Sequence, residues 1–157
     1  MNLRSRTAAV LGALTMALTG AATPSQAADY PTTHFRVTIS DGADEWHSGA
    51  QGAFTWYNRS VLVDWYMYLK NGECASVSFV ALKADGSRIT SGGRDDCNQY
   101  TSNWFQQSDI SLNASSIVGG VRHIMVLVYD VNHRRDACIE YTRPTFKPRP
   151  ASAQCKL

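Results

Sequence analysis

The sequence predicts an all-β fold, a single antiparallel β-sandwich of about eight short strands stabilised by disulfides. Apolar and polar residues alternate with the two-residue period of strands, and a helical period is almost absent. Turn signals such as Asp-Gly and Asn-Gly separate the strand-like runs. The same pattern is compatible with a distorted barrel, and of the two we predict the sandwich. The chain has no internal repeat, no linker and room for only one core, so we expect a single unit.

Residues 1–27 have the features of a secretion signal. Arg4 and Arg6 supply a positive start, an apolar run follows from Ala8 to Leu18, and Ser25-Gln26-Ala27 forms a small-x-small cleavage site. The apolar run is too short to span a bilayer as a helix. We therefore expect the leader to be removed and the product to be secreted, extracellular and free of the membrane.

Three strands are predicted in the first half of the remaining chain. Residues 33–40 alternate cleanly, with His34, Arg36 and Thr38 on the face opposite the apolar one. Residues 52–57 and 60–69 form a predicted hairpin. Its second arm places alternate apolar side chains on one face: Val61, Val63, Trp65, Met67 and Leu69.

The second half begins with a strand at residues 74–83, and the Asp85-Gly86 turn after it is the strongest hairpin signal in the chain. A short return strand is expected at 88–90. From 91 to 120 the pattern loosens into Gly, Ser, Asn and Asp, which predicts loops with one or two short strands. Residues 121–131 are nearly all apolar and predict a central strand covered on both faces, paired with 137–142.

Four cysteines, Cys74, Cys97, Cys138 and Cys155, follow the leader. An even number in an exported chain predicts disulfides, in one of three connectivities. We favour Cys74 with Cys97 and Cys138 with Cys155, because each closes a short loop and stabilises by about 3 kcal/mol on the chain-entropy model. There is no Cys-x-x-Cys pair and no finger-like histidine spacing, so we predict no metal and no cofactor.

The charge balance excludes a general affinity for nucleic acid or anionic membranes. The chain carries 15 basic and 13 acidic residues, and two of the basic ones lie in the leader, so the remainder is close to neutral. We assign residues 28–142 to the sandwich and 143–157 to an extended, proline-containing basic tail. A solvated tail is favoured over an electrostatic docking arm.

One segment carries a family resemblance. Residues 52–61 give an aromatic strand, a tight turn and a second strand, and a cysteine pair and the later Gly119-Gly120-Val121-Arg122 follow. This pattern resembles a group of small secreted all-β proteins of actinomycetes. The resemblance implies the fold and export, and it carries over no catalytic residue because that group has no assigned activity.

The predicted binding face lies on residues 60–69. If the apolar set faces the core, Tyr66 and Tyr68 line the opposite face beside Asp64. With Trp104 they would form a platform whose rings stack on sugars while Asp64 orients hydroxyls. The alternative is a second covered face whose aromatic side chains only fill space. The leading hypothesis is a secreted, non-catalytic binding module for an extracellular polysaccharide or protein.

Two other functions are weighed against this one. A protease inhibitor would present the predicted loop from Gly92 to Asn103, held by Cys97. A small hydrolase would use Asp64 and Asp130, each placed in an otherwise apolar strand, as acid and base. No orienting motif surrounds either aspartate, so no catalytic residue is predicted, and Asp95-Asp96 is interpreted as a solvated acidic turn rather than a calcium site.

Overall fold

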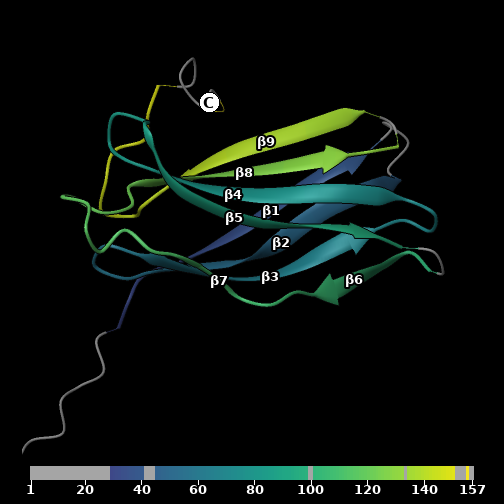
Figure 1. Ribbon diagram of the computed structural model, residues 1–157, viewed down its shortest axis with the longest axis horizontal. Helices are drawn as coiled ribbons and strands as arrows, with labels where there is room; N and C mark the ends of the chain where they lie inside the picture. Colours follow the sequence, from purple (N-terminus) through teal and green to yellow (C-terminus); the bar gives the residue numbers. More distant parts are fainter. Residues whose placement is uncertain (1–28, 41–44, 99–100, 133, 151–154, 156–157) are drawn as a thin grey trace, which may run out of the picture.

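The computed structural model is an all-β sandwich, which confirms the predicted fold class (Figure 1). The structure describes residues 29–40, 45–98, 101–132, 134–150 and 155, and these contain strands and turns but no helix. The predicted leader at 1–27 lies outside these residues. Among those described, no helix has the length and apolar character needed to cross a membrane.

Two antiparallel sheets form the layers. Sheet A has the order β1-β2-β3-β6, and β7 also pairs with β3. Its strands are β1 (Thr32–Ser40), β2 (Trp46–Trp56), β3 (Val61–Leu69), β6 (Asn103–Gln106) and β7 (Ile110–Leu112). Sheet B has the order β5-β4-β8-β9. Its strands are β4 (Cys74–Leu82), β5 (Arg88–Cys97), β8 (His123–Asp130) and β9 (Arg135–Thr142).

The core lies between the two inner faces, where the alternating apolar residues of both sheets meet. The five residues predicted to share one face of β3 are all buried. Aromatic rings fill the centre: the Phe35 and Phe54 ring centroids are 4.4 Å apart, and those of Trp65 and Phe79 are 5.0 Å apart. Burying such large apolar side chains is the main stabilising contribution to a sandwich of this size.

The segment from 91 to 120 is more regular than predicted. The return strand expected at 88–90 is present, but strand β5 continues to Cys97 and pairs with β4 along its length, so its predicted end is wrong. The two glycines that were interpreted as loop residues lie inside β5, at positions where neighbouring atoms leave no room for a side chain. A Cβ on Gly93 would lie 2.1 Å from the Val77 carbonyl oxygen, and one on Gly92 would lie 2.5 Å from the Ile110 side chain of β7.

Both predicted disulfides are confirmed. Cys74–Cys97 joins residues that are directly opposite each other on β4 and β5, and Cys138–Cys155 joins β9 to the end of the chain. Two disulfides indicate an oxidising, extracellular type of environment. Both bonds start from sheet B, and neither of them links sheet B to sheet A.

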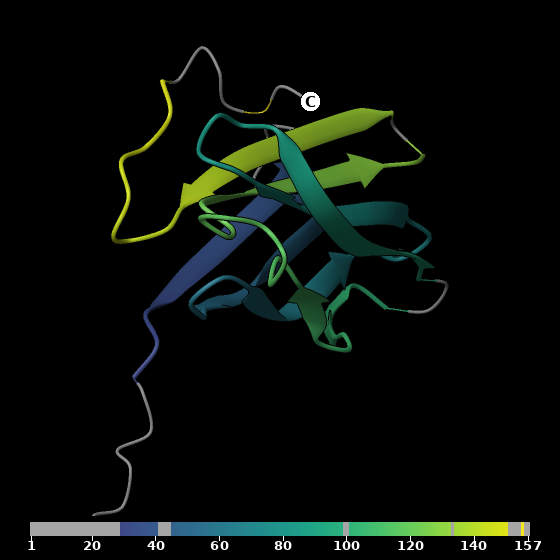
Figure 2. The same ribbon diagram turned by 60° about the vertical axis from the view of Figure 1, so that its left-hand side comes forward.

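Residues 143–150 form a loop that leaves the end of β9 and turns back (Figure 2), and the Cys138–Cys155 disulfide joins the tail to β9 again. We call residues 143–150 and Cys155 the strap. Arg143 is buried and donates hydrogen bonds to the carbonyl oxygens of Tyr57 and Asn58. Arg149 donates to Glu140 over 2.9 Å. These two arginines are therefore not part of a solvated tail, because β9 and the β2–β3 turn supply acceptors for them.

The strap and its disulfide complete a second apolar cluster on the outer face of sheet B, formed by Val80, Leu82 and Met125 with Leu127, Cys138 and Cys155. The predicted central strand β8 is thus buried on both faces over much of its length. His123 lies in the same region with its ring 5.7 Å from Phe146. Burial lowers the pKa of His123 and raises that of Glu140, while Arg149 opposes the rise at Glu140.

Candidate functional site

A β-bulge in sheet A decides which side chains form its outer face. Ile39 pairs with Ser48, but Ser40 pairs with Trp46, so His47 is an extra residue in β2. The shift places Trp46 on the outer face together with the polar side of β1. It turns His47 to the interior, where it is 6% exposed.

Trp46 joins an aromatic cluster built by register. Tyr68 of β3 lies directly opposite Trp104 of β6, and their ring centroids are 5.3 Å apart. The Trp46 ring lies 5.9 Å from Tyr68 and 6.2 Å from Trp104, in edge-to-face contact with both. Such contacts each add about 1 kcal/mol beyond burial and hold the rings in place.

Arg36 of β1 lies against this cluster. Its guanidinium carbon is 4.1 Å from the centroid of Trp46 and 5.4 Å from that of Trp104. Within the described part of the chain, the guanidinium has no hydrogen bond or ion pair to the protein. Two indole rings therefore orient a cation whose five N–H donors remain available to a ligand.

A shallow open groove of about 410 Å³ runs beside the cluster. Its floor is Gln51, Gly52 and Ala53 of β2, and its walls rise from the larger side chains on either side. The β1 wall carries His34 and Arg36, and the β3 wall carries Asp64 and Tyr66. The floor is lowest at Gly52, which has no side chain, and at Ala53, which lies between His34 and Asp64. Gln51 lies between Arg36 and Tyr66 and adds an amide to the floor.

The structure brings all four predicted binding residues to this one face. Asp64 and Tyr66 are exposed, and Tyr68 and Trp104 are half-buried in the aromatic cluster. The sequence interpretation omitted Arg36, Trp46 and the groove floor from the site. The alternation of residues 33–40 had already placed His34 and Arg36 on a common polar face, but their approach to Tyr66 depends on the pairing β1-β2-β3.

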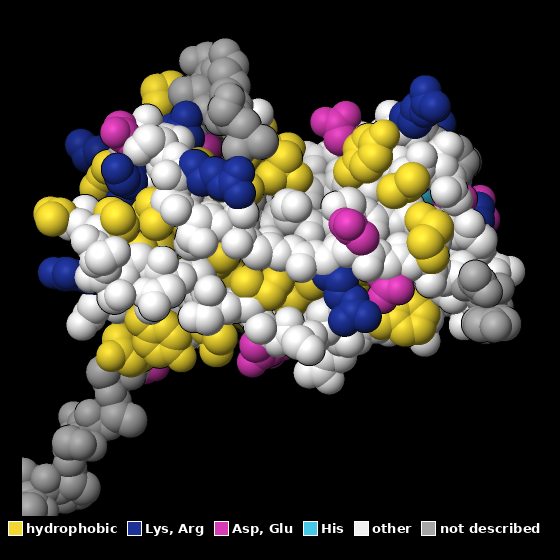
Figure 3. Space-filling model, in the orientation of Figure 1, with side chains coloured by type: hydrophobic (Ala, Val, Ile, Leu, Met, Phe, Trp, Pro, Cys, Tyr) yellow, Lys and Arg dark blue, Asp and Glu magenta, His cyan; other side chains and the backbone are white. Residues whose placement is uncertain are grey.

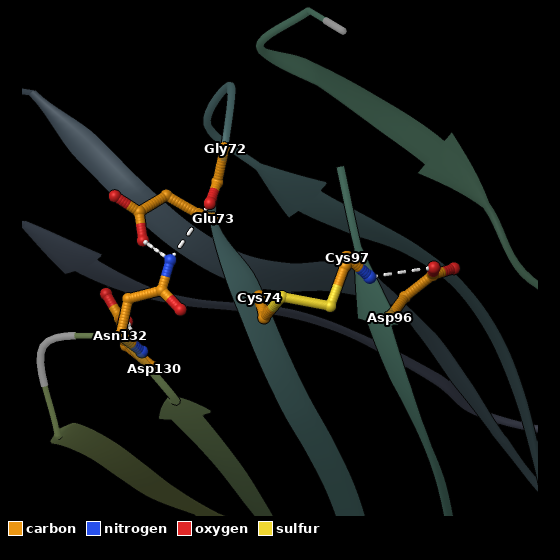
Figure 4. The surroundings of a disulfide bond; sticks show 7 residues. All are labelled: Gly72, Glu73, Cys74, Asp96, Cys97, Asp130 and Asn132. Atoms are coloured by element: carbon orange, nitrogen blue, oxygen red, sulfur yellow. Dashed lines mark hydrogen bonds between the residues drawn. A yellow bond between two sulfur atoms is a disulfide. The ribbon is translucent and has the colours of Figure 1, made fainter. Parts of the chain in front are cut away.

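The two aspartates of the hydrolase hypothesis do not come together. Asp64 is exposed on the outer face of sheet A, whereas Asp130 is fully buried at the end of β8 in sheet B. Asp130 accepts a hydrogen bond from the backbone N–H of Asn132 and lies near His47 and Glu73. Figure 4 shows Asp130 and Asn132 beside Glu73. Among the residues that the structure describes, His47, Glu73 and Asp130 are the group whose ligand atoms lie close enough together to hold a metal ion.

The first half of the loop of the inhibitor hypothesis is strand, because residues 92–97 belong to β5. Asn98 is buried, and its side-chain amide donates to the carbonyl oxygen of Leu69 over 3.3 Å. Asp95 and Asp96, which were expected in an acidic turn, lie instead in strand β5, opposite Ser76 and Ala75. Asp85 lies at the other end of this hairpin, where it caps the β4–β5 turn through Ser87.

On the side of the molecule seen in Figure 3, acidic and basic side chains are scattered among hydrophobic ones, so this side has no large patch of one charge.

No family model matches the chain, and comparison with curated proteins and with solved structures finds no match either. The resemblance to secreted actinomycete proteins stays a prediction, and function must be inferred from the site itself.

Proposed function

We propose that this protein is a secreted, non-catalytic binding module for an extracellular polysaccharide, and that its site is the outer face of sheet A. We call this surface the open face; it comprises His34, Arg36, Trp46, Asp64, Tyr66, Tyr68 and Trp104. The observation that carries the proposal is the groove along β2, with an exposed tyrosine and an aspartate on one wall and an oriented arginine on the other.

The chemistry of the groove suits a sugar chain. A pyranose ring has an apolar C–H face and a rim of hydroxyls, so it binds where an aromatic ring lies beside hydrogen-bond donors and acceptors. Tyr66 is 37% exposed and offers the ring. Asp64 accepts hydrogen bonds from hydroxyls, and Arg36 donates to hydroxyl or carboxylate oxygens. The open shape of the groove favours a polymer that enters and leaves along it.

The aromatic cluster has a different role from the one that its sequence suggested. Tyr68 and Trp104 pack edge to face or tilted against their neighbours, and Arg36 lies over the Trp104 and Trp46 rings. In this proposal these rings fix Arg36, and Tyr66 is the principal stacking residue.

The number of carboxylates in the groove supports binding without hydrolysis. Hydrolysis of a glycoside by the common mechanisms needs two carboxyl groups about 5 to 9.5 Å apart. Asp64 is the one carboxylate among the residues that line the groove, and all of these belong to the described part of the chain. Asp64 thus serves as a hydrogen-bond acceptor.

The test is retention of the oxidised protein on insoluble polysaccharides and cell walls. Tyr66→Ala and Arg36→Gln are expected to lower retention at least tenfold. Tyr129→Ala is the matched control, because Tyr129 is 42% exposed on β8 of the other sheet. Loss of retention in the control, or full retention in both open-face variants, contradicts the proposal. Capture of a secreted protease that neither variant affects would favour the inhibitor instead.

A further inference from the structure

A polar cluster lies in the interior at one end of the sandwich, apart from the open face. His47 comes from the bulge in β2, Glu73 immediately precedes β4, and Asp130 ends β8. Their exposed fractions are 6%, 9% and 0%. Two carboxylates and an imidazole are rarely buried together unless they are paired or bind a metal.

The strand periods explain why the three side chains meet. Glu73 and Asp130 have the same parity as the core residues Ala75 and Val128, so both face the space between the sheets. His47 would point outward in a regular strand, and the bulge turns it inward. One ligand atom from each residue lies within 4.8 Å of the others, and His47 Nδ1 is 3.5 Å from Glu73 Oε1.

We propose that His47, Glu73 and Asp130 bind a divalent transition-metal ion of the zinc class. Imidazole nitrogen with two carboxylate oxygens is a donor set that Zn²⁺ accepts, at bond lengths of roughly 2.0–2.2 Å. Ligands on a tetrahedral ion at those lengths lie about 3.4 Å apart, close to the His47–Glu73 separation. The ion replaces that direct contact, and small side-chain movements bring the third ligand into range.

Asn132 holds the carboxylates in a suitable orientation (Figure 4). Its side-chain amide donates to Glu73 Oε2 over 2.8 Å and to the Gly72 carbonyl oxygen over 2.9 Å, while its backbone N–H donates to Asp130 Oδ1 over 3.0 Å. Glu73 Oε1 lies on the side of His47, 3.5 Å from its Nδ1, and in this proposal it is the oxygen that binds the ion. Such outer hydrogen bonds are a common feature of protein metal sites.

The ion would link the two sheets. His47 belongs to sheet A, whereas Glu73 and Asp130 are held by sheet B, and neither disulfide makes this connection. A metal bound to the folded state alone raises the melting temperature. No ligand spacing is recognisable in the sequence, because the three residues are far apart in the chain and meet only through the bulge.

The test uses the oxidised protein, exported by its host and purified without a histidine tag. After dialysis against Zn²⁺ and then buffer, we expect about one zinc per chain by elemental analysis, and EDTA to lower Tm by roughly 5 °C or more. Loading with Co²⁺ should give visible d–d absorption. His47→Gln is expected to abolish the zinc, the Co²⁺ bands and the EDTA effect, whereas the exposed His34→Gln keeps all three.

Glu73→Gln provides a second variant in case His47→Gln fails to fold, because a glutamine oxygen still accepts the bond from Asn132. It is expected to bind zinc at least tenfold more weakly and to keep the fold by circular dichroism. The proposal is overturned if the wild-type protein retains less than a tenth of an equivalent of zinc and cobalt and EDTA leaves Tm unchanged. It is also overturned if zinc persists in both variants.

Discussion

The outer faces of the two sheets differ in what the chain does with them. On sheet B the strap, the Cys138–Cys155 disulfide and the Arg149–Glu140 pair bury an apolar and ionisable surface. On sheet A the exposed side chains Arg36, Asp64 and Tyr66 surround a groove. On the outer face of sheet B, aromatic and charged residues are covered and stabilise the fold. On the outer face of sheet A, residues of the same kinds remain exposed, where a ligand can reach them.

Removal of the strap's disulfide should have the largest effect on stability. Cys138→Ser with Cys155→Ser is expected to lower the free energy of unfolding by about 3 kcal/mol, because the loop entropy returns to the unfolded chain and Val80, Leu82 and Met125 lose cover. Denaturant unfolding measures the loss. If polysaccharide retention falls as much as stability does, the two faces are not independent and the comparison fails.

Removal of the charge partner of Glu140 should have the next largest effect. Arg149→Met leaves a buried carboxylate without its 2.9 Å partner and should cost about 2 kcal/mol at pH 7, less than for a fully buried pair since Arg149 is partly exposed. Burial raises the pKa of Glu140 and Arg149 lowers it. The variant's deficit should therefore shrink as the pH falls and Glu140 is protonated. An equal deficit at pH 5 and pH 8 contradicts this account.

A smaller effect on stability is expected when the pH is lowered and His123 is protonated. Burial holds the pKa of this imidazole below its usual 6.5, so the unfolded chain binds the proton more readily. His123 thus stabilises the fold fully above pH 6.5, and this contribution is lost as the pH falls through the lowered pKa. The stability of the wild-type protein relative to His123→Asn should decline as the pH is lowered from 7.5 to 5.5. A relative stability that does not vary with pH rules out burial of the neutral ring.

The smallest effects on stability should come from the exposed tyrosines. Tyr66→Ala and Tyr129→Ala are each expected to change the free energy of unfolding by about 0.5 kcal/mol or less. The two substitutions separate only in binding, where Tyr66→Ala loses retention and Tyr129→Ala keeps it. Thermal unfolding beside the retention assay checks both halves. A loss above about 2 kcal/mol in Tyr66→Ala would mean that its ring serves the fold rather than a ligand.

Most of the fold could be predicted from local periodicity. Alternation identified β1, β3 and the inward set on β3, and short loop lengths selected both disulfides. The main error was β5, where Gly92 and Gly93 were interpreted as loop residues. A glycine required for close approach and a glycine required for a turn look the same in a sequence, because only the tertiary contact distinguishes them.

The site could be predicted only in part. Parity along β3 grouped Asp64, Tyr66 and Tyr68, but Arg36 and the groove depend on the sheet order, which no local pattern specifies. Trp46 was also missed, since its side of β2 follows from a bulge beyond the predicted start of that strand. Sequence periods give the face of a residue within one strand, whereas neighbouring strands decide what that face meets.

The bulge in β2 couples the outer face of sheet A to the polar cluster in the interior, because it determines the position of a residue in each. Trp46 and His47 are adjacent in the chain, yet one side chain packs with Arg36 outside and the other lies beside Glu73 inside. Deleting one residue here would restore simple alternation and take at least one of them from its partners. A change of length at the bulge is therefore expected to disturb one of these two contacts, so natural variants should preserve the spacing between Trp46 and Ser48 even where they replace the side chains.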